Sequence, residues 1–348
     1  LQSPPRLRVD LIWLGQMLII VLLSLLFIFA LLWAHDSYLR RQITAQLPAA
    51  GQFIETPRAD LHYLKSEADT GAEEQPVFVL IHGSSASCYD VMASMGAALQ
   101  PFGTVLAFDR PGLGRSRLKV SAEAMAHPGE QADELHLAIA KLGYKNPIII
   151  GHSWGGSVAM AYAQRHGDAM TGAVILAAPL YPWDNKPAWY NRMVTWPLVG
   201  RLLTHSVVTK YGLGQLQAGV AATAYPERIF DGYSEKVGLA GVLLPRNFIT
   251  NAIYSNQLSD HLAKMQHGYG SVTTPLILIG GDRDQTVHTK RNSHRLQETL
   301  PQTELIYLRG VGHMLHHTQI DKITDAARRL AKRQVQAGIH EFGQRQAD

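Results

Sequence analysis

Short runs of β-branched and leucine residues alternate with helical patterns through most of this 348-residue chain. Runs of this kind indicate strands that are buried on both faces of a parallel sheet and joined by crossover helices. They predict strands at 52–55, 61–65, 76–82, 104–109, 147–152, 173–177, 275–280 and 304–308. The intervening patterns predict helices at 89–99, 129–142, 154–166, 290–300 and 318–333. We therefore expect an α/β fold with a mostly parallel central sheet and helices on both faces.

One interval, 180–271, interrupts this alternation. It separates two predicted core strands and contains Trp183, Trp189 and Trp196 among several amphipathic stretches. A structureless loop of this length is uncommon inside a compact domain. We expect a helical cap over the carboxyl ends of the strands, where open α/β sheets bind their ligands. The cap would divide the core into two parts, at 51–179 and 272–337. A tail at 338–348 would follow the second part.

An almost uninterrupted apolar stretch lies near the start of the chain, at 11–34. About 20 such residues are enough for a helix to cross a bilayer. Trp13 and Trp33 lie near its two ends, where aromatic rings favour the headgroup region. A cleaved signal peptide has a shorter apolar core, and a buried core helix keeps a polar stripe, so both alternatives fit less well. We predict a single transmembrane anchor here, after a tail at 1–10 and before a linker at 35–50.

Charge and cysteine content narrow the classes of partner. The net charge is +4 without a dense basic run, and basic residues flank the predicted anchor on both sides. We therefore expect no nucleic-acid partner, and the side of the membrane that carries the globular part stays open. Cys88 is the single cysteine, which excludes an intrachain disulfide and a cysteine-based zinc site. We expect no cofactor.

A G-x-S-x-G pattern runs from Gly151 to Gly155, between a predicted strand and a predicted helix. In such an elbow the serine sits on a tight, strained turn, and side chains two residues to either side would collide. The pattern alone is weak evidence, but a strand before it and a helix after it form the structural context that it requires. Ser153 is therefore the candidate nucleophile.

A serine hydroxyl needs a base and a carboxylate that orients the base, and both follow later strands in the order Ser, Asp, His. We prefer Asp284 to Asp282, because the later residue can turn back toward the pocket while the earlier one tends to cap the turn. We prefer His313 to His316 and His317, which we expect at the start of the last helix. Three neighbouring histidines could also bind a metal ion, but no second ligand cluster of suitable spacing accompanies them.

The oxyanion of acyl transfer needs backbone N–H donors. One candidate is the amide of Trp154, directly after the nucleophile. The other is the amide of Ser84, in the loop after the strand at 76–82. We interpret the side chains of His82 and Gly83 in the same loop as structural.

Three motifs resemble those of the α/β-hydrolase family. His82-Gly83 resembles its oxyanion loop, Asp109 to Ser116 its D-x-P-G-x-G-x-S turn, and Gly151 to Gly155 its nucleophile elbow. The resemblance covers most of 76–317 and implies an α/β-hydrolase fold with a Ser-His-Asp triad. It also implies that Asp109 is structural. The anchor and the triad spacing are similar to the membrane-bound monoacylglycerol lipase type of the family.

The resemblance implies a membrane-anchored serine hydrolase that cleaves a carboxylic ester, either a small molecule or a lipid. The aromatic cap and the anchor favour an apolar substrate. Relatives that act on haloalkanes or epoxides carry Asp at the elbow, so Ser153 argues against both reactions. Three alternatives remain: a carbon–carbon bond hydrolase, a cofactor-free perhydrolase, and a binding protein without turnover.

Overall fold

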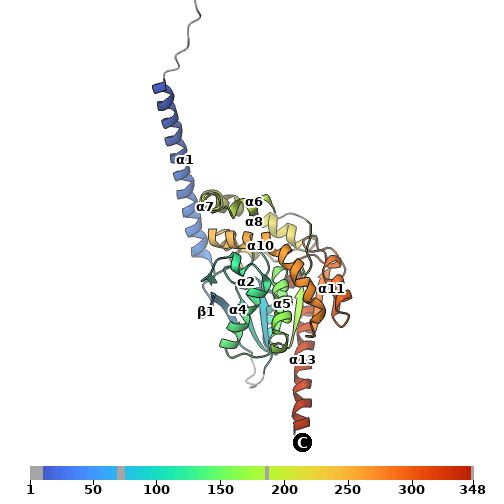
Figure 1. The fold of residues 1–348 in the computed structure, drawn as a ribbon. Helices are drawn as coiled ribbons and strands as arrows, with labels where there is room; N and C mark the ends of the chain where they lie inside the picture. Colours follow the sequence, from blue (N-terminus) through green and yellow to red (C-terminus); the bar gives the residue numbers. More distant parts are fainter. Residues whose placement is uncertain (1–10, 69–74, 185–187, 346–348) are drawn as a thin grey trace, which may run out of the picture.

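The computed structural model describes residues 11–68, 75–184 and 188–345. A long helix, α1 (Leu11–Gln46), projects from a globular part that contains a central sheet and its surrounding helices (Figure 1). The predicted tail at 1–10 lies outside the described residues.

Helix α1 does not end where the apolar stretch ends. It continues to Gln46, so most of the predicted linker at 35–50 is helical. In this second part Asp36 and Ile43 are buried, and Arg40 forms an ion pair with Asp36 at 2.8 Å. Packing against the globular part therefore prolongs the helix. Among the described residues, α1 is the one helix long and apolar enough to cross a membrane. Its most apolar 18 residues have a mean hydropathy of 3.0, and none of them is buried.

The sheet has the order β1-β2-β4-β3-β6-β7-β8-β9. Its first strands pair antiparallel, and every pair from β4 to β9 is parallel. The strands are β1 (Gln52–Glu55), β2 (Ala59–Ser66), β3 (Val77–Ile81), β4 (Thr104–Phe108), β5 (Arg117–Leu118), β6 (Ile148–His152), β7 (Gly172–Leu176), β8 (Leu276–Gly281) and β9 (Glu304–Leu308). Eight of these were predicted. The sequence analysis missed β5, a two-residue strand that pairs with β2 and lacks an apolar run.

Two layers of helices cover the sheet, and alternate side chains of β3 face one layer or the other. Val77, Val79 and Ile81 belong to the cluster on one face, and Phe78 and Leu80 to the cluster on the other. The first face packs against α4 (Pro128–Lys141), α5 (Trp154–His166) and α11 (Ser293–Thr299), and the second against α2 (Cys88–Val91), α3 (Ala97–Leu99) and α13 (Ile320–Arg345). The predicted α/β fold with two helical layers is confirmed.

Three predicted helices differ in detail. A π-helical turn, Met92–Gly96, separates α2 from α3 within the predicted helix at 89–99. The last predicted helix is preceded by a separate short helix, α12 (Leu315–Thr318), and α13 continues to Arg345 through most of the predicted tail. A 3₁₀ turn, Thr289–Arg291, precedes α11.

The interval between β7 and β8 is helical, as predicted for a cap. It contains α6 (Trp189–Val194), α7 (Pro197–Thr204), α8 (Val208–Ala224), α9 (Tyr233–Lys236), the 3₁₀ turn η5 (Leu239–Leu243), α10 (Pro245–Met265) and the 3₁₀ turn η6 (Gln266–Ser271). Helices α6 and α7 contact α10, and α8 contacts α1. In Figure 1 these helices gather at the end of the globular part from which α1 projects.

Candidate active site

Ser153 occupies a strained turn between β6 and α5. Its φ of 52° lies in the left-handed region, which non-glycine residues rarely adopt, and its N–H donates to the carbonyl of Leu176 at 2.8 Å. A Cβ at Gly151 would collide with the backbone of Gly155, and a Cβ at Gly155 would collide with the carbonyl of Ile81 on β3. The first glycine is therefore required by the turn itself, whereas the second is required by the neighbouring strand.

The structure brings Ser153, His313 and Asp284 into one hydrogen-bonded series. His313 Nε2 lies 3.0 Å from Ser153 Oγ, and His313 Nδ1 lies 2.8 Å from Asp284 Oδ2. The three residues follow β6, β9 and β8, so each comes from a loop at the carboxyl edge of the sheet. All three side chains are buried. Because Asp284 accepts from Nδ1–H, the lone pair of Nε2 faces the serine hydroxyl.

The two candidate aspartates have different surroundings. Asp284 is buried, and its second oxygen accepts the backbone N–H groups of Thr286 at 2.8 Å and Val287 at 2.7 Å. Asp282 is exposed, and its carboxylate accepts the N–H of Gly310 at 2.6 Å. Asp284 therefore contacts the imidazole, whereas Asp282 joins the loops after β8 and β9.

The loop that contains Ser84 lies against Ser153. A Cβ at Gly83 would come within 3.1 Å of Ser153 Cβ. Ser85 has a φ of 50°, and Asn251 of α10 both accepts its backbone N–H at 3.1 Å and donates to its hydroxyl at 3.2 Å. The cap thus fixes the conformation of this loop. Trp154 begins α5, where the first N–H groups of a helix have no intrahelical acceptor.

Arg110 is fully buried and stacks on the indole ring of Trp154. Its guanidinium carbon lies 4.1 Å from the centroid of the indole ring, and its hydrogen bonds to Gln131 and to the carbonyl of Gly83 are long, at 3.5 Å. Burial lowers its pKa to about 9, so it stays charged at neutral pH. Its stacking on the indole and its contact with Gly83 fix the two segments that carry the candidate oxyanion donors.

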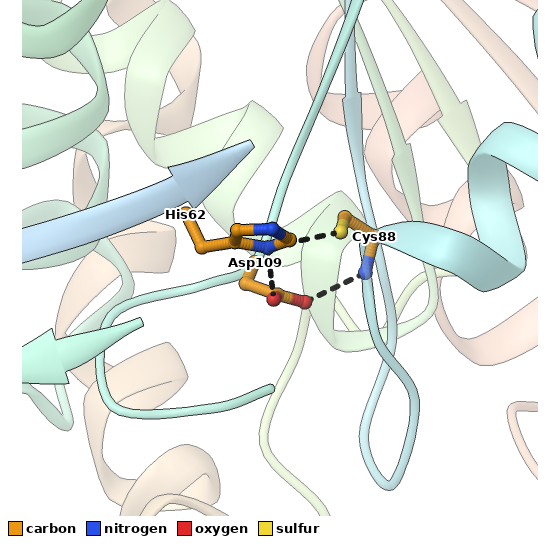
Figure 2. A group of neighbouring side chains, drawn as sticks. All are labelled: His62, Cys88 and Asp109. Atoms are coloured by element: carbon orange, nitrogen blue, oxygen red, sulfur yellow. Dashed lines mark hydrogen bonds and ion pairs between the residues drawn. The ribbon is translucent and has the colours of Figure 1, made fainter. Parts of the chain in front are cut away.

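Asp109 lies in a separate buried cluster with His62 and Cys88 (Figure 2). Its carboxylate accepts from His62 Nδ1 at 2.8 Å and from the backbone N–H groups of Cys88 at 2.8 Å and Arg115 at 2.9 Å. The His62, Cys88 and Asp109 side chains place atoms of the kinds that bind metal ions close to one another. However, N–H donors already occupy both carboxylate oxygens, and burial raises the pKa of the Cys88 thiol well above its usual range. The cluster holds the D-x-P-G-x-G-x-S turn together.

His316 and His317 bind Asp90 of α2. Their Nε2 atoms lie 3.1 Å and 2.8 Å from its carboxylate, and Tyr233 of the cap donates to the same carboxylate at 2.8 Å. Burial would raise the pKa of Asp90, but its contacts with the two imidazoles outweigh that effect and hold the pKa well below its usual range. Both histidines lie on α12 rather than at the start of the last helix. They attach the segment after His313 to α2 and to the cap.

Glu227 is a cap residue that contacts the loop between β9 and α12. Its carboxylate accepts the N–H of Gly312 at 2.7 Å and the hydroxyl of Thr318 at 3.2 Å. A side chain at Gly312 would collide with the carbonyl of Tyr225, so the cap lies directly against the residue that precedes His313. The sequence analysis missed Glu227, Asn251 and Asp90, because no motif marks residues that act through contacts distant in sequence.

Three buried histidines make stability depend on pH. Burial lowers the pKa of His82 and of His316 from 6.5 to about 4, and that of His152 well below 6.5. In the folded protein they stay neutral, whereas the unfolded chain takes up protons below pH 6.5. We therefore expect the free energy of unfolding to be at its full value above pH 6.5 and to fall toward pH 4, by up to about 1.4 kcal/mol per pH unit for each histidine.

Chemical denaturation in detergent at pH 7, 6 and 5 measures this dependence. The variant His316→Asn keeps a donor for Asp90. It should reduce the pH dependence of the free energy of unfolding by the contribution of one histidine. Equal stability at all three pH values would contradict the expectation.

Comparison with known proteins identifies the family. The sequence matches the family described as "Alpha/beta hydrolase family" over residues 78–326. Epoxide hydrolase 3 of Xenopus tropicalis is 30% identical over 118 residues, which are 34% of this chain and 30% of that protein. The match thus spans less than a third of that relative's length.

Solved structures share the fold. A membrane phospholipase A, described as a bacterial virulence factor, has a TM-score of 0.59 at 19% identity and covers 91% of this chain and 98% of its own. A protein from Burkholderia cenocepacia described as a "putative aryl esterase" has a TM-score of 0.64 at 19% identity, with coverages of 81% of this chain and 99% of its own. With the sheet order, the elbow and the match over 78–326, these similarities lead to one conclusion: the chain belongs to the α/β hydrolase family.

Proposed function

We propose that the chain is a membrane-anchored serine hydrolase that cleaves a carboxylic ester. The observation that carries this proposal is the hydrogen-bonded series from Ser153 Oγ through His313 to Asp284, on a strained turn beside Gly83. A hydroxyl in contact with an imidazole that a carboxylate orients is the arrangement that activates a serine for acyl transfer. Ser153 at the elbow favours esters over epoxides, because the family resemblance implies Asp at this position in members that open epoxides.

In the first half of the reaction Ser153 Oγ attacks the acyl carbon while His313 Nε2 takes the hydroxyl proton. The resulting oxyanion accepts hydrogen bonds from the amides of Ser84 and Trp154, and the positive end of α5 adds to its stabilisation. Collapse of the tetrahedral intermediate breaks the ester bond, and the imidazolium gives its proton to the departing alcohol. An acyl group then remains on Ser153.

In the second half His313 takes a proton from water, and the hydroxide attacks the acyl-enzyme. Collapse releases the carboxylic acid, and the proton returns to Ser153. Asp284 keeps Nδ1 protonated throughout, and the two amides that bind its other oxygen fix the carboxylate. Each catalytic group is thus restored at the end of the cycle.

The anchor supports a lipid-like ester as substrate. The apolar part of α1 is exposed along its length, as expected of a helix that has lipid around it. We propose that α1 spans the bilayer and holds the hydrolase part at its surface. An ester dissolved in the membrane would then be concentrated near the cap.

Turnover of p-nitrophenyl esters of graded acyl length and of monoacylglycerols in vesicles tests the proposed substrate class. We expect the membrane-bound protein to hydrolyse both kinds of ester and to prefer the longer acyl chains of the series. Cleavage of diketones without ester hydrolysis would favour a carbon–carbon hydrolase. Oxidation that requires added hydrogen peroxide would favour a perhydrolase, and either result alone would contradict the ester proposal.

Glu227 is expected to act as a positioning residue for His313. Replacing it with alanine leaves the N–H of Gly312 without its acceptor and lets the loop shift. Displacement of a catalytic group by about 1 Å can cost 100-fold in rate, so we expect kcat to fall about tenfold or more with little change in KM. Steady-state ester hydrolysis measures both parameters.

Two variants control this prediction. Glu227→Gln keeps an acceptor oxygen and should recover most of the activity. Glu235→Ala removes an exposed carboxylate of the same charge from α9 of the cap and should resemble the wild type. If Glu227→Ala changes KM alone, the residue serves substrate binding and the positioning role is wrong.

A further inference from the structure

Large apolar side chains are exposed together on α6, α7 and α8 of the cap. Trp189, Leu198 and Tyr211 are 71%, 79% and 73% exposed, and Trp196 and Leu202 are more than half exposed. These residues lie on α6, α7 and α8, except for Trp196, which directly precedes α7. Helix α7 contacts both α6 and α8. Large apolar side chains exposed on helices that contact one another indicate a site of interaction. We call the exposed side of these three helices the outer cap face.

The outer cap face carries positive charge without negative charge. Arg192, Arg201 and Lys210 lie on its helices and are exposed. Between Asp184 and Glu227 the chain contains no acidic residue. Aromatic and leucine residues combined with basic residues alone are the composition of helices that lie in the interface of an anionic bilayer.

The position of the outer cap face relative to α1 fits a membrane. On their inner side α6 and α7 pack against α10, and α8 contacts α1. In Figure 1 the three helices form the end of the globular part from which the apolar length of α1 projects. Trp33 and Tyr38, both exposed, mark the end of that apolar length nearest the globular part. A bilayer that surrounds residues 11–34 would therefore begin beside the outer cap face.

We propose that the outer cap face rests on the bilayer that α1 spans. Trp189, Leu198 and Tyr211 insert into the headgroup region, and the basic side chains contact anionic lipid headgroups. This proposal rests on the anchor proposed above and adds a second contact to it. The second contact fixes the tilt of the globular part and turns the cap toward substrate in the membrane.

An environment-sensitive fluorophore at single cysteines tests this contact in the full chain. Cys88 is buried and does not compete for the label. We would label Leu198→Cys on the outer cap face, Leu22→Cys in the apolar part of α1, and Leu137→Cys, an exposed leucine on α4. The chain is reconstituted in phosphatidylcholine vesicles with or without phosphatidylglycerol, and doxyl lipids serve as quenchers. Reaction of Ser153 with a fluorophosphonate in the same samples monitors folding.

We expect a blue shift and quenching at positions 22 and 198 and neither at position 137. The signal at 198 should weaken without phosphatidylglycerol or after replacement of Arg192, Arg201 and Lys210 by glutamine. A signal at 22 without one at 198 would overturn the proposal and leave the anchor intact. No signal at 22 would remove the anchor and with it this contact. The same label is also measured in nanodiscs that hold one chain or two. A signal at 198 that appears only with two chains would assign the outer cap face to a second copy and overturn the proposal.

Discussion

Replacing Ser153 with alanine is expected to abolish ester hydrolysis, lowering kcat by about 10⁴- to 10⁶-fold. The substitution removes the hydroxyl that lies 3.0 Å from His313 Nε2 and leaves the rest of the site in place. Alanine keeps the Cβ that the left-handed backbone at this position already accommodates, so the fold should persist. Steady-state hydrolysis of a p-nitrophenyl ester by the reconstituted protein measures the loss.

Ser157, in the first turn of α5, provides a matched control. It lies one turn after Ser153, is buried, and donates to the carbonyl of Pro179 at 2.6 Å rather than to a catalytic group. Ser157→Ala should keep activity close to that of the wild type. Equal losses in the two variants would point to a disturbed α5 and against Ser153 as the nucleophile.

Asp284→Asn is expected to lower kcat by about 10⁴-fold, because the imidazole would be held in the wrong tautomer. One carboxylate oxygen of Asp284 already accepts two backbone N–H groups, so the amide nitrogen of asparagine would face His313 Nδ1. The Nε2 atom would then carry the proton and could not accept one from Ser153. Ester hydrolysis across the pH range measures this effect.

Asp282→Asn tests the choice between the two aspartates. Asp282 is exposed and binds the N–H of Gly310, an interaction that asparagine can keep through its side-chain oxygen. We expect nearly normal kcat in this variant. A larger loss at Asp282 than at Asp284 would show that the wrong residue has been assigned as the partner of His313.

Elements whose pattern is local could be predicted from the sequence. The core strands are buried on both faces, so each leaves a continuous apolar run that ends at a turn residue. Ser153, Asp284 and His313 could be singled out because each lies in the segment that follows such a strand, and parallel strands end at one edge. Gly151 of the elbow could be predicted because the collision that it avoids involves the nearby backbone of Gly155, whereas Gly155 avoids the carbonyl of Ile81 on β3.

Features that depend on contacts distant in sequence could not be predicted. Helix α1 continues beyond its apolar stretch because Asp36 and Ile43 are buried. Strand β5 exists only as a partner of β2. Glu227 and Asn251 bind the loops beside His313 and Ser84, but both lie in a cap whose sequence carries no motif. Nothing in their local sequence distinguishes them from other polar residues.

Reaction of the membrane-embedded chain with a fluorophosphonate, followed by mass spectrometry of its peptides, tests whether Ser153 is the nucleophile. A fluorophosphonate reacts with a serine that a neighbouring base activates. We expect a single adduct, on Ser153, which is absent from Ser153→Ala and forms far more slowly in His313→Ala. A wild-type chain that folds but does not react, or that carries its adduct on another serine, would contradict the assignment of Ser153 as the nucleophile.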